Sequence, residues 1–290
     1  MTRLRFRLIL LAALALAGCS AGVLDPAGPV AAGERTILLN ALVIMLGIVV
    51  PTIVVALATA WWFRAGNKRA TYLPEWSYSG RLELLVWSIP ALVVIFIGGI
   101  TWIGSHQLAP ERPLDSRVKP VTVQVVALDW KWLFIYPEQG VATVNRLVIP
   151  AGTPIAFRIT SGTVMNSFFV PQLGSQIYAM AGMDSKLHLQ ADRPGQFRGL
   201  SAHYSGEGFA DMGFAVDAVP PAQFAAWVGA TRGGGGLVLD GPGFMQLARA
   251  KGNVTPIAYR AVLPGLYDRV VAQSGVPAHK ETQAAGRENK

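Results

Sequence analysis

Cysteine is almost absent from this chain of 290 residues, which contains only Cys19. A single cysteine excludes an internal disulfide, a thiolate pair bridging two copper ions, and a haem-attachment pair. Charged residues are also scarce, at 14% of the chain, against about 25% in a typical soluble domain. Hydrophobic residues make up 52%. This balance is typical of a membrane protein.

Several functional motifs are missing as well. The sequence has no nucleophile motif and no glycine-rich phosphate loop. The formal net charge is +8, and it becomes 8 − 3 = +5 if Arg3, Arg5 and Arg7 are removed with an N-terminal segment. No basic run alternates with aromatic residues, so nucleic acid is not expected as a partner.

The N-terminus has the layout of an export signal. A basic start and the apolar run Leu8–Leu16 precede Leu-Ala-Gly-Cys, which ends at Cys19 and resembles a bacterial lipoprotein box. We therefore expect residues 1–18 to be a lipoprotein signal peptide, with cleavage behind Gly18 and acylation, palmitate included, at Cys19. An ordinary signal peptide with an incidental cysteine is the alternative.

Two long apolar runs follow. Residues 19–35 lack periodicity and are expected to form a periplasmic N-terminal tether, and residues 36–106 a transmembrane helical hairpin. The segment Thr36–Phe63 contains no charged residue, and it is long enough to cross a hydrocarbon core of about 30 Å as a helix. The alternative is a buried helical hairpin in a soluble protein.

The charges between the two runs orient the hairpin. Arg64, Lys68, Arg69 and Arg81 outnumber Glu75 and Glu83 in the loop over residues 64–83. Basic residues in a short loop indicate the cytoplasmic side. The chain after residue 106 is therefore expected in the periplasm of a bacterium, on a multi-pass protein of the inner membrane.

The remaining chain predicts an all-β domain with a helical extension. Residues 107–120 are a proline-containing linker, and residues 121–219 hold short β-branched and aromatic stretches that predict an antiparallel sandwich. Residues 220–278 are expected to form a small, aromatic-rich helical extension, and residues 279–290 a disordered tail. The strands are expected at Val121–Leu128, Lys131–Tyr136, Leu147–Ile149, Ile155–Thr160, Phe168–Val170, Lys186–Leu189, Phe197–Ser201 and Met212–Val219.

Residues 200–214 have the spacing of a metal-binding loop without its ligands. With histidine at Asn166 and Phe209 and cysteine at Ser201 and Ser205, this loop and the segment around Asn166 would form a dinuclear copper site closed by Met212. Copper selects thiolate and imidazole rather than hydroxyl, amide or phenyl groups. We expect these positions to be a degenerate copper site that binds no metal.

This pattern resembles subunit II of the haem–copper terminal oxidases. Serine in place of the two cysteines is similar to the quinol-oxidising branch, whose ubiquinol oxidases are of the cytochrome bo type. The likeness includes the stretches 129–140 and 173–183, and it extends from Cys19 into the C-terminal segment. It implies a cupredoxin-like sandwich on this chain, no cofactor of its own, and haems and copper on a partner subunit I.

The resemblance also assigns a candidate catalytic role to Glu83. A glutamate at this point stands near the entrance of the proton channel in the family, and acids at a membrane edge often mark ion paths. The alternative is an interfacial carboxylate balanced by Arg81. Trp130 occupies a motif through which copper-bearing relatives admit electrons, but here no copper follows, so packing is the better interpretation.

The histidines predict no metal centre. His188 alternates with leucines on a predicted strand and is expected to face solvent, His279 lies in the tail, and His106 caps the second span. His203 stands in the degenerate loop, where copper-bearing relatives hold a glutamate. No second imidazole or thiolate accompanies it in the motif.

Taken together, these features lead us to interpret the chain as subunit II of a proton-translocating ubiquinol oxidase that reduces oxygen to water. Its expected partners are oxidase subunits I, III and IV, ubiquinol and membrane lipid. A menaquinol oxidase subunit is the nearest alternative. A membrane-anchored copper or electron carrier and a structural lipoprotein are further alternatives from other classes.

Overall fold

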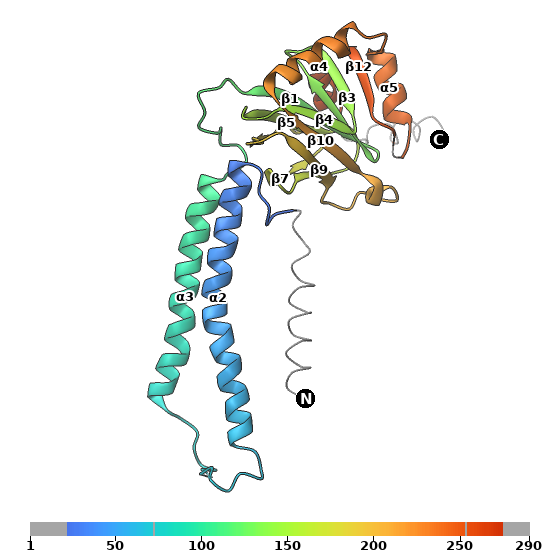
Figure 1. The fold of residues 1–290 in the computed structure, drawn as a ribbon. Helices are drawn as coiled ribbons and strands as arrows, with labels where there is room; N and C mark the ends of the chain where they lie inside the picture. The colour runs from blue at the N-terminus through green and yellow to red at the C-terminus, as the bar shows by residue number, and fades with distance from the viewer. Residues whose placement is uncertain (1–21, 72, 253, 275–290) are drawn as a thin grey trace, which may run out of the picture. The chain divides into compact units, whose positions relative to one another are not determined.

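The residues on either side of the apolar hairpin fold together, while the hairpin is a unit of its own (Figure 1). The computed structural model describes residues 22–71, 73–252 and 254–274. Within these, one unit is Gly33–Leu108, and the other combines residues 22–32 with residues 109–274. The expected signal peptide, Cys19 and the tail over residues 279–290 lie outside the described residues.

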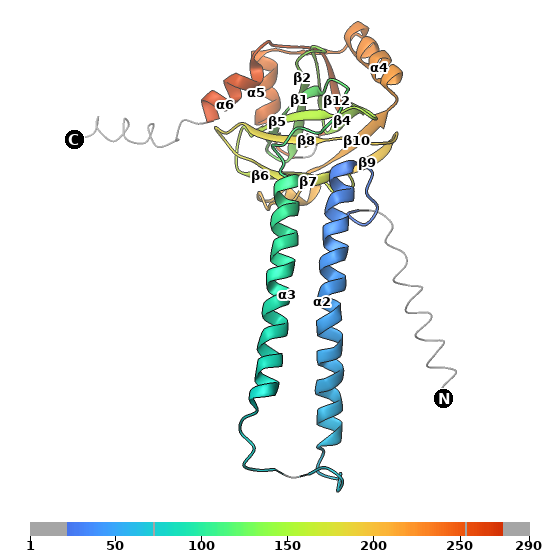
Figure 2. The same ribbon diagram turned by 90° about the vertical axis from the view of Figure 1, so that its left-hand side faces the viewer.

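The hairpin consists of two long apolar helices lying side by side, α2 (Pro29–Trp62) and α3 (Gly80–Gln107) (Figures 1 and 2). Within each helix an 18-residue stretch reaches a mean hydropathy of 2.8 in α2 and 2.3 in α3, and by length and composition both are able to cross a membrane. Most of their large apolar side chains are exposed. In α2 the helix starts at Pro29, seven residues before the predicted span, because proline suits the first helical position.

The second unit is a sandwich of two sheets (Figure 1). The seven-stranded sheet has the order β11-β12-β3-β2-β1-β5-β8, and the five-stranded sheet has the order β4-β10-β9-β6-β7. Its strands up to residue 219 are β1 (Val121–Leu128), β2 (Lys131–Tyr136), β3 (Val141–Val144), β4 (Arg146–Pro150), β5 (Ile155–Ser161), β6 (Asn166–Val170), β7 (Gly174–Ala179), β8 (Ser185–Leu189), β9 (Gly195–Ser201) and β10 (Gly213–Val219).

The sandwich is mixed rather than antiparallel, so that part of the sequence prediction was wrong. Strand β1 runs parallel to β5, and β10 runs parallel to β4, while the other pairs among β1–β10 are antiparallel. Alternation of apolar residues predicts a strand but carries no information about the direction of its neighbour.

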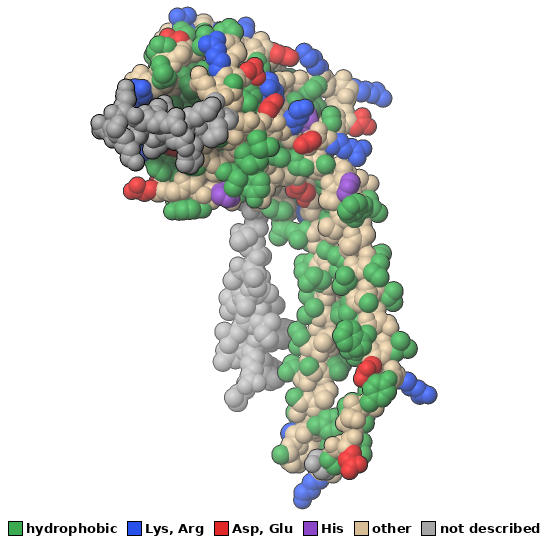
Figure 3. Space-filling view, turned by 180° about the vertical axis from the view of Figure 1, so that it is seen from behind, with side chains coloured by type: hydrophobic (Ala, Val, Ile, Leu, Met, Phe, Trp, Pro, Cys, Tyr) green, Lys and Arg blue, Asp and Glu red, His purple; other side chains and the backbone are tan. Residues whose placement is uncertain are grey.

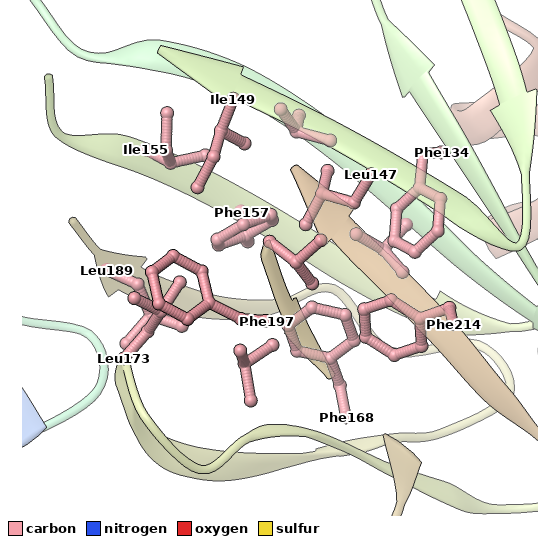
Figure 4. Packing of buried hydrophobic residues seen from close by; sticks show 14 of the residues in the cluster. Phe134, Leu147, Ile149, Ile155, Phe157, Phe168, Leu173, Leu189, Phe197 and Phe214 are labelled. Carbon is pink, nitrogen blue, oxygen red and sulfur yellow. The ribbon is translucent and has the colours of Figure 1, made fainter. Parts of the chain in front are cut away.

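Aromatic rings fill the space between the sheets (Figure 4). Phe168 stacks on Phe214 with ring centroids 5.2 Å apart, and Trp132 meets both rings edge-on at 5.5 and 5.7 Å. The Tyr136 hydroxyl joins the sheets, because it donates to the Val148 carbonyl at 2.9 Å and accepts from the Val148 N–H at 2.8 Å. Burial raises the pKa of Tyr136, so its hydroxyl stays protonated and can donate.

Strand β2 is buried on both faces, because a second cluster covers the outside of the seven-stranded sheet. Leu133 and Ile135 point away from the sandwich core and contact residues of the C-terminal extension, among them Leu247 and Tyr267. This extension holds α4 (Pro221–Gly233), β11 (Leu237–Leu239), α5 (Gly241–Arg249), β12 (Ile257–Val262) and α6 (Leu266–Ser274).

The sequence had predicted a helical extension. The structure shows that the extension also contains two strands, β11 and β12. Its strand β12 pairs antiparallel with β3, with Tyr259 opposite Ala142, and β11 pairs with β12. The open edge of β3 supplies backbone partners for the alternating apolar residues of β12.

A polar cluster fastens α6 to the sandwich. The Tyr267 hydroxyl donates to Asp184 at 2.8 Å, and Arg158 reaches the same carboxylate at 2.8 Å and Asp268 at 3.1 Å. The pKa of Tyr267 is raised by burial and by the Asp184 carboxylate, so the hydroxyl remains a donor.

The segment before α2 is packed rather than a free tether, which corrects the expectation for residues 19–35 where they are described. The Ala27 N–H donates to Gln172 at 2.7 Å, the Asp192 N–H donates to Ala27 at 2.8 Å, and Val30 is buried. Gly28 fits so closely that a Cβ atom would lie 2.0 Å from the Gln190 carbonyl oxygen. The hydrogen bonds of Ala27 and the close approach of Gly28 involve backbone atoms, so a segment of small residues without a periodic pattern can dock here.

Candidate functional site

The degenerate copper loop lies between β9 and β10, beside the start of β6. It contains the short 3-10 helix η1 (Phe209–Asp211). Strands β6 and β9 are paired with Phe168 opposite Ser201, so Asn166 and Ser201 come within reach of each other. Met212 follows η1, and its carbonyl accepts from the Ser201 N–H at 3.2 Å. The structure thus brings Asn166, Ser201 and Met212 together.

These positions are linked by hydrogen bonds between neutral groups. The Ser201 hydroxyl donates to Asn166 Oδ1 at 3.3 Å, and the Asn166 amide donates to the Val164 carbonyl at 3.0 Å. Ser205 Oγ lies 3.9 Å from the thioether sulfur of Met212. Asn166, Ser201 and Met212 are all less than 5% exposed. The arrangement satisfies buried polar groups within the protein, as a stable core requires.

The donors present do not suit copper. Met212 contributes a thioether, but its neighbours offer a hydroxyl and an amide rather than thiolate and imidazole. Phe209 packs its ring against Tyr204, with centroids 5.6 Å apart. Among the described residues no group of three or more His, Cys, Asp or Glu side chains could hold a metal ion.

Trp130, in the turn between β1 and β2 of the seven-stranded sheet, contacts this loop. Its indole N–H donates to the Ser205 carbonyl at 3.2 Å, and its ring lies against Gly208, where a Cβ atom would come within 2.4 Å. Trp130 also has a φ of 58°, a left-handed conformation uncommon for a bulky residue. The contacts support the packing interpretation, in which the indole anchors the loop.

The histidines are dispersed. His203 is half-buried against the Tyr178 ring at 5.9 Å, and its buried Nδ1 has no hydrogen-bond partner among the described residues. His188 is half-buried rather than solvent-facing, because the linker covers it and its Nδ1 lies 3.3 Å from the Pro110 carbonyl. His106 is exposed in the last turn of α3, 2.8 Å from the Trp102 carbonyl. His279 lies outside the described residues.

Glu83 lies in the first turn of α3, where its side chain is exposed. No ion pair joins it to Arg81 in the described part of the chain. Two residues so spaced lie on different sides of a helix, which explains why they do not meet. A carboxylate in the first turn is favoured by the helix dipole.

A buried lysine was missed by sequence reasoning. Lys131 is fully buried on β2, and its ammonium donates to the carbonyls of Asp129 and Ala250. Burial lowers the pKa of Lys131, while the nearby Asp129 carboxylate raises it. Ala250 ends α5, where a positive charge is favourable. The sequence signal that could have indicated this burial is the position of Lys131 between Trp130 and Trp132, at the start of a predicted strand.

The comparisons with known proteins agree with this architecture. Residues 134–219 match the family profile of the cytochrome c oxidase subunit II periplasmic domain. The chain is 48% identical to a cytochrome bo(3) ubiquinol oxidase subunit 2 of Pseudomonas aeruginosa, over 90% of this chain and 78% of that protein. It is 49% identical to a ubiquinol oxidase subunit 2 of Acetobacter aceti, over 93% of this chain and 89% of that protein.

A solved structure gives a more distant likeness. The periplasmic domain of cytochrome oxidase subunit II (CoxB) of Bradyrhizobium japonicum is 23% identical, with a TM-score of 0.38, over 40% of this chain and 96% of that one.

The contact between Trp130 and Gly208 can be tested by adding one methyl group. Gly208→Ala should lower the free energy of unfolding by about 1–3 kcal/mol, because overpacking forces the ring or the loop to move. The measurement is chemical unfolding of the detergent-solubilised chain followed by near-ultraviolet circular dichroism. Gly229→Ala is the control, since a Cβ atom there meets nothing within 4 Å. Equal midpoints for the two variants would contradict a close contact.

Proposed function

The chain belongs to the subunit II family of the quinol oxidases, and from this membership we propose that it is the subunit II of a proton-translocating ubiquinol oxidase. Its complex oxidises quinol and reduces oxygen to water, with the catalytic site on subunit I. The observation that carries the proposal is the intact loop frame around Ser201 and Ser205, in which none of the five positions of the degenerate copper site carries a thiolate or an imidazole. Electrons from a soluble periplasmic donor would have no metal to enter on this chain, whereas quinol reaches the complex through the membrane.

The ubiquinol assignment is supported by the names of the relatives at 48% and 49% identity, both ubiquinol oxidases. Steady-state oxygen consumption of the purified complex with ubiquinol and with menaquinol tests it. Faster turnover with menaquinol would favour the menaquinol alternative. Co-purification of a haem-bearing subunit separates both from a structural lipoprotein.

The surface of the hairpin is consistent with the proposal that this chain has partner subunits in the membrane. Its exposed apolar faces require lipid or other helices around them, and a groove of about 660 Å³ between α2 and α3 is lined by apolar residues such as Met45, Val49 and Val93. The proposed main partner is subunit I, which would carry the haems and the copper of the complex. Subunits III and IV complete the proposed complex.

The organisation of the domains supports a multi-pass topology in the inner membrane. Residues 22–32 and residues 109–274 belong to one folded unit, although the hairpin separates them in the sequence. Both ends of the hairpin must therefore emerge on the same side of a membrane, which an even number of crossings provides. The basic loop between the helices then faces the cytoplasm and the sandwich faces the periplasm.

We further propose that Cys19 becomes the acylated N-terminus after removal of residues 1–18. Two spans already hold the chain in the membrane, so the lipid is a supplementary tether. Cys19→Ala should therefore leave the chain in the membrane fraction, with only a modest loss of oxidase activity. Intact mass spectrometry of the mature chain provides the direct test, and an unmodified Cys19 thiol would exclude the proposal.

The sandwich is proposed to bind no cofactor. Because no ligand set couples metal binding to folding, an equimolar amount of copper should leave the melting temperature of the detergent-solubilised chain unchanged. A chelator-treated sample is the reference. The complete chain is the right material, because residues 25–32 form part of the sandwich edge. A copper-dependent rise in melting temperature with a purple absorption band would contradict the proposal and favour the copper-carrier alternative.

Glu83 is proposed to present a titratable oxygen at the proton-channel entrance. Glu83→Gln keeps the side-chain shape but removes proton exchange, so oxygen consumption per haem should fall by roughly tenfold or more. Glu83→Asp should recover part of the rate. Assembly should be preserved, because the loss of the helix-dipole contribution costs only about 0.3–1 kcal/mol.

The matched control is Glu75→Gln, which removes an exposed carboxylate from the same loop. Turnover of Glu83→Gln equal to that of the control, at equal haem content, would leave Glu83 as an interfacial acid.

A further inference from the structure

The loop joining the two membrane helices is basic, aromatic and exposed. This basic loop, residues 61–81, contains four cations and one carboxylate, Glu75. Its exposed aromatic side chains are Trp61, Trp62, Phe63, Trp76 and Tyr78. In Figure 3, charged side chains gather at the loop end of the hairpin, while the helices are mostly green and tan.

Local contacts order the first half of the basic loop. The Arg64 guanidinium donates to the Trp61 carbonyl at 2.7 Å and lies over the Trp61 ring at 4.6 Å. The Asn67 amide donates to the Trp62 carbonyl at 2.6 Å, and Asn67 Oδ1 accepts from the Arg69 N–H at 3.1 Å. These bonds cap the end of α2 and hold the turn that carries Lys68 and Arg69.

The charged ends of Lys68 and Arg69 are left without an internal partner. Both side chains are exposed, and no ion pair is formed by either one within the described residues. The only carboxylate of the basic loop does not neutralise them. Two adjacent cations are thus presented outward beside the aromatic residues.

The length of α3 agrees with a position of this surface at the lipid headgroups. At 1.5 Å per residue, the 28 residues of α3 are about 42 Å long. This matches the thickness of a bilayer with its headgroup regions, about 40–45 Å. Tryptophan and tyrosine favour this interfacial depth, and cations there are attracted to anionic headgroups.

We propose that the basic loop binds the headgroup of an anionic phospholipid, a phosphodiester without a compensating cation, through Lys68 and Arg69. The aromatic side chains lie at the same depth and fix the loop against the bilayer surface. The inference rests on the membrane placement of the hairpin proposed above, but not on quinol chemistry or on Glu83.

The test uses the intact oxidase complex in neutral detergent, titrated at low ionic strength with fluorescent phosphatidylglycerol or with a matched phosphatidylcholine. The wild type should prefer phosphatidylglycerol by about thirtyfold. K68Q/R69Q should weaken phosphatidylglycerol binding by about thirtyfold, because each cation near an anionic surface contributes about fivefold. Binding of phosphatidylcholine should not change.

The matched control is K119Q/K186Q, which removes two exposed cations outside the basic loop, one just before β1 and one on β8, and should leave the binding of both lipids unaffected. Haem content per chain verifies assembly and reports separately on the oxidase function. If the loop variant does not accumulate in the membrane at all, the wild type alone decides: its preference should collapse as the Debye length falls from about 30 Å to about 3 Å with added salt.

Four results would overturn the proposal. These are equal affinity for the two lipids, an equal loss in both double variants, displacement of the lipid by inorganic phosphate, and loss of a partner subunit from K68Q/R69Q. The third result would indicate a free-phosphate site, and the fourth an acidic segment of another subunit.

Discussion

The periplasmic unit depends on a sheet that is apolar on both faces. Strand β2 has six consecutive buried residues, with Trp132 and Phe134 on the inner side and Leu133 and Ile135 on the outer side. Such a sheet is stable in water only if each face is covered. The five-stranded sheet covers the inner face, and the extension after residue 220 covers the outer one. The polar cluster around Asp184 then fastens α6 over the outer cover.

The sequence predicted the best-covered strands most accurately. The bounds expected for β1 and β2 agree with the structure, because dense β-branched and aromatic residues mark a strand whatever its neighbours are. Strand β12 was missed because its pairing is decided by the open edge of β3, more than a hundred residues earlier. The docking of Ala27 was missed because backbone groups make it.

The candidate site divides in the same way. Residue types alone indicated that Ser201 and Ser205 are poor copper ligands, and the family resemblance related them to Asn166. The hydrogen bond from Ser201 to Asn166 and the anchoring of the loop by Trp130 depend on side-chain geometry, which no spacing pattern specifies. The contacts that hold this loop are made by an indole and by backbone groups.

The packed segment before α2 imposes an order on the biogenesis of the chain. Residues 25–32 are synthesised before most of α2 and all of α3, yet their hydrogen-bond partners, Gln172 and Asp192, are synthesised only after both helices. This edge of the sandwich can therefore close only when both helices and the later strands have been made. The hairpin is thus enclosed between two segments of a single folded unit, and the first of these segments has to wait for the second.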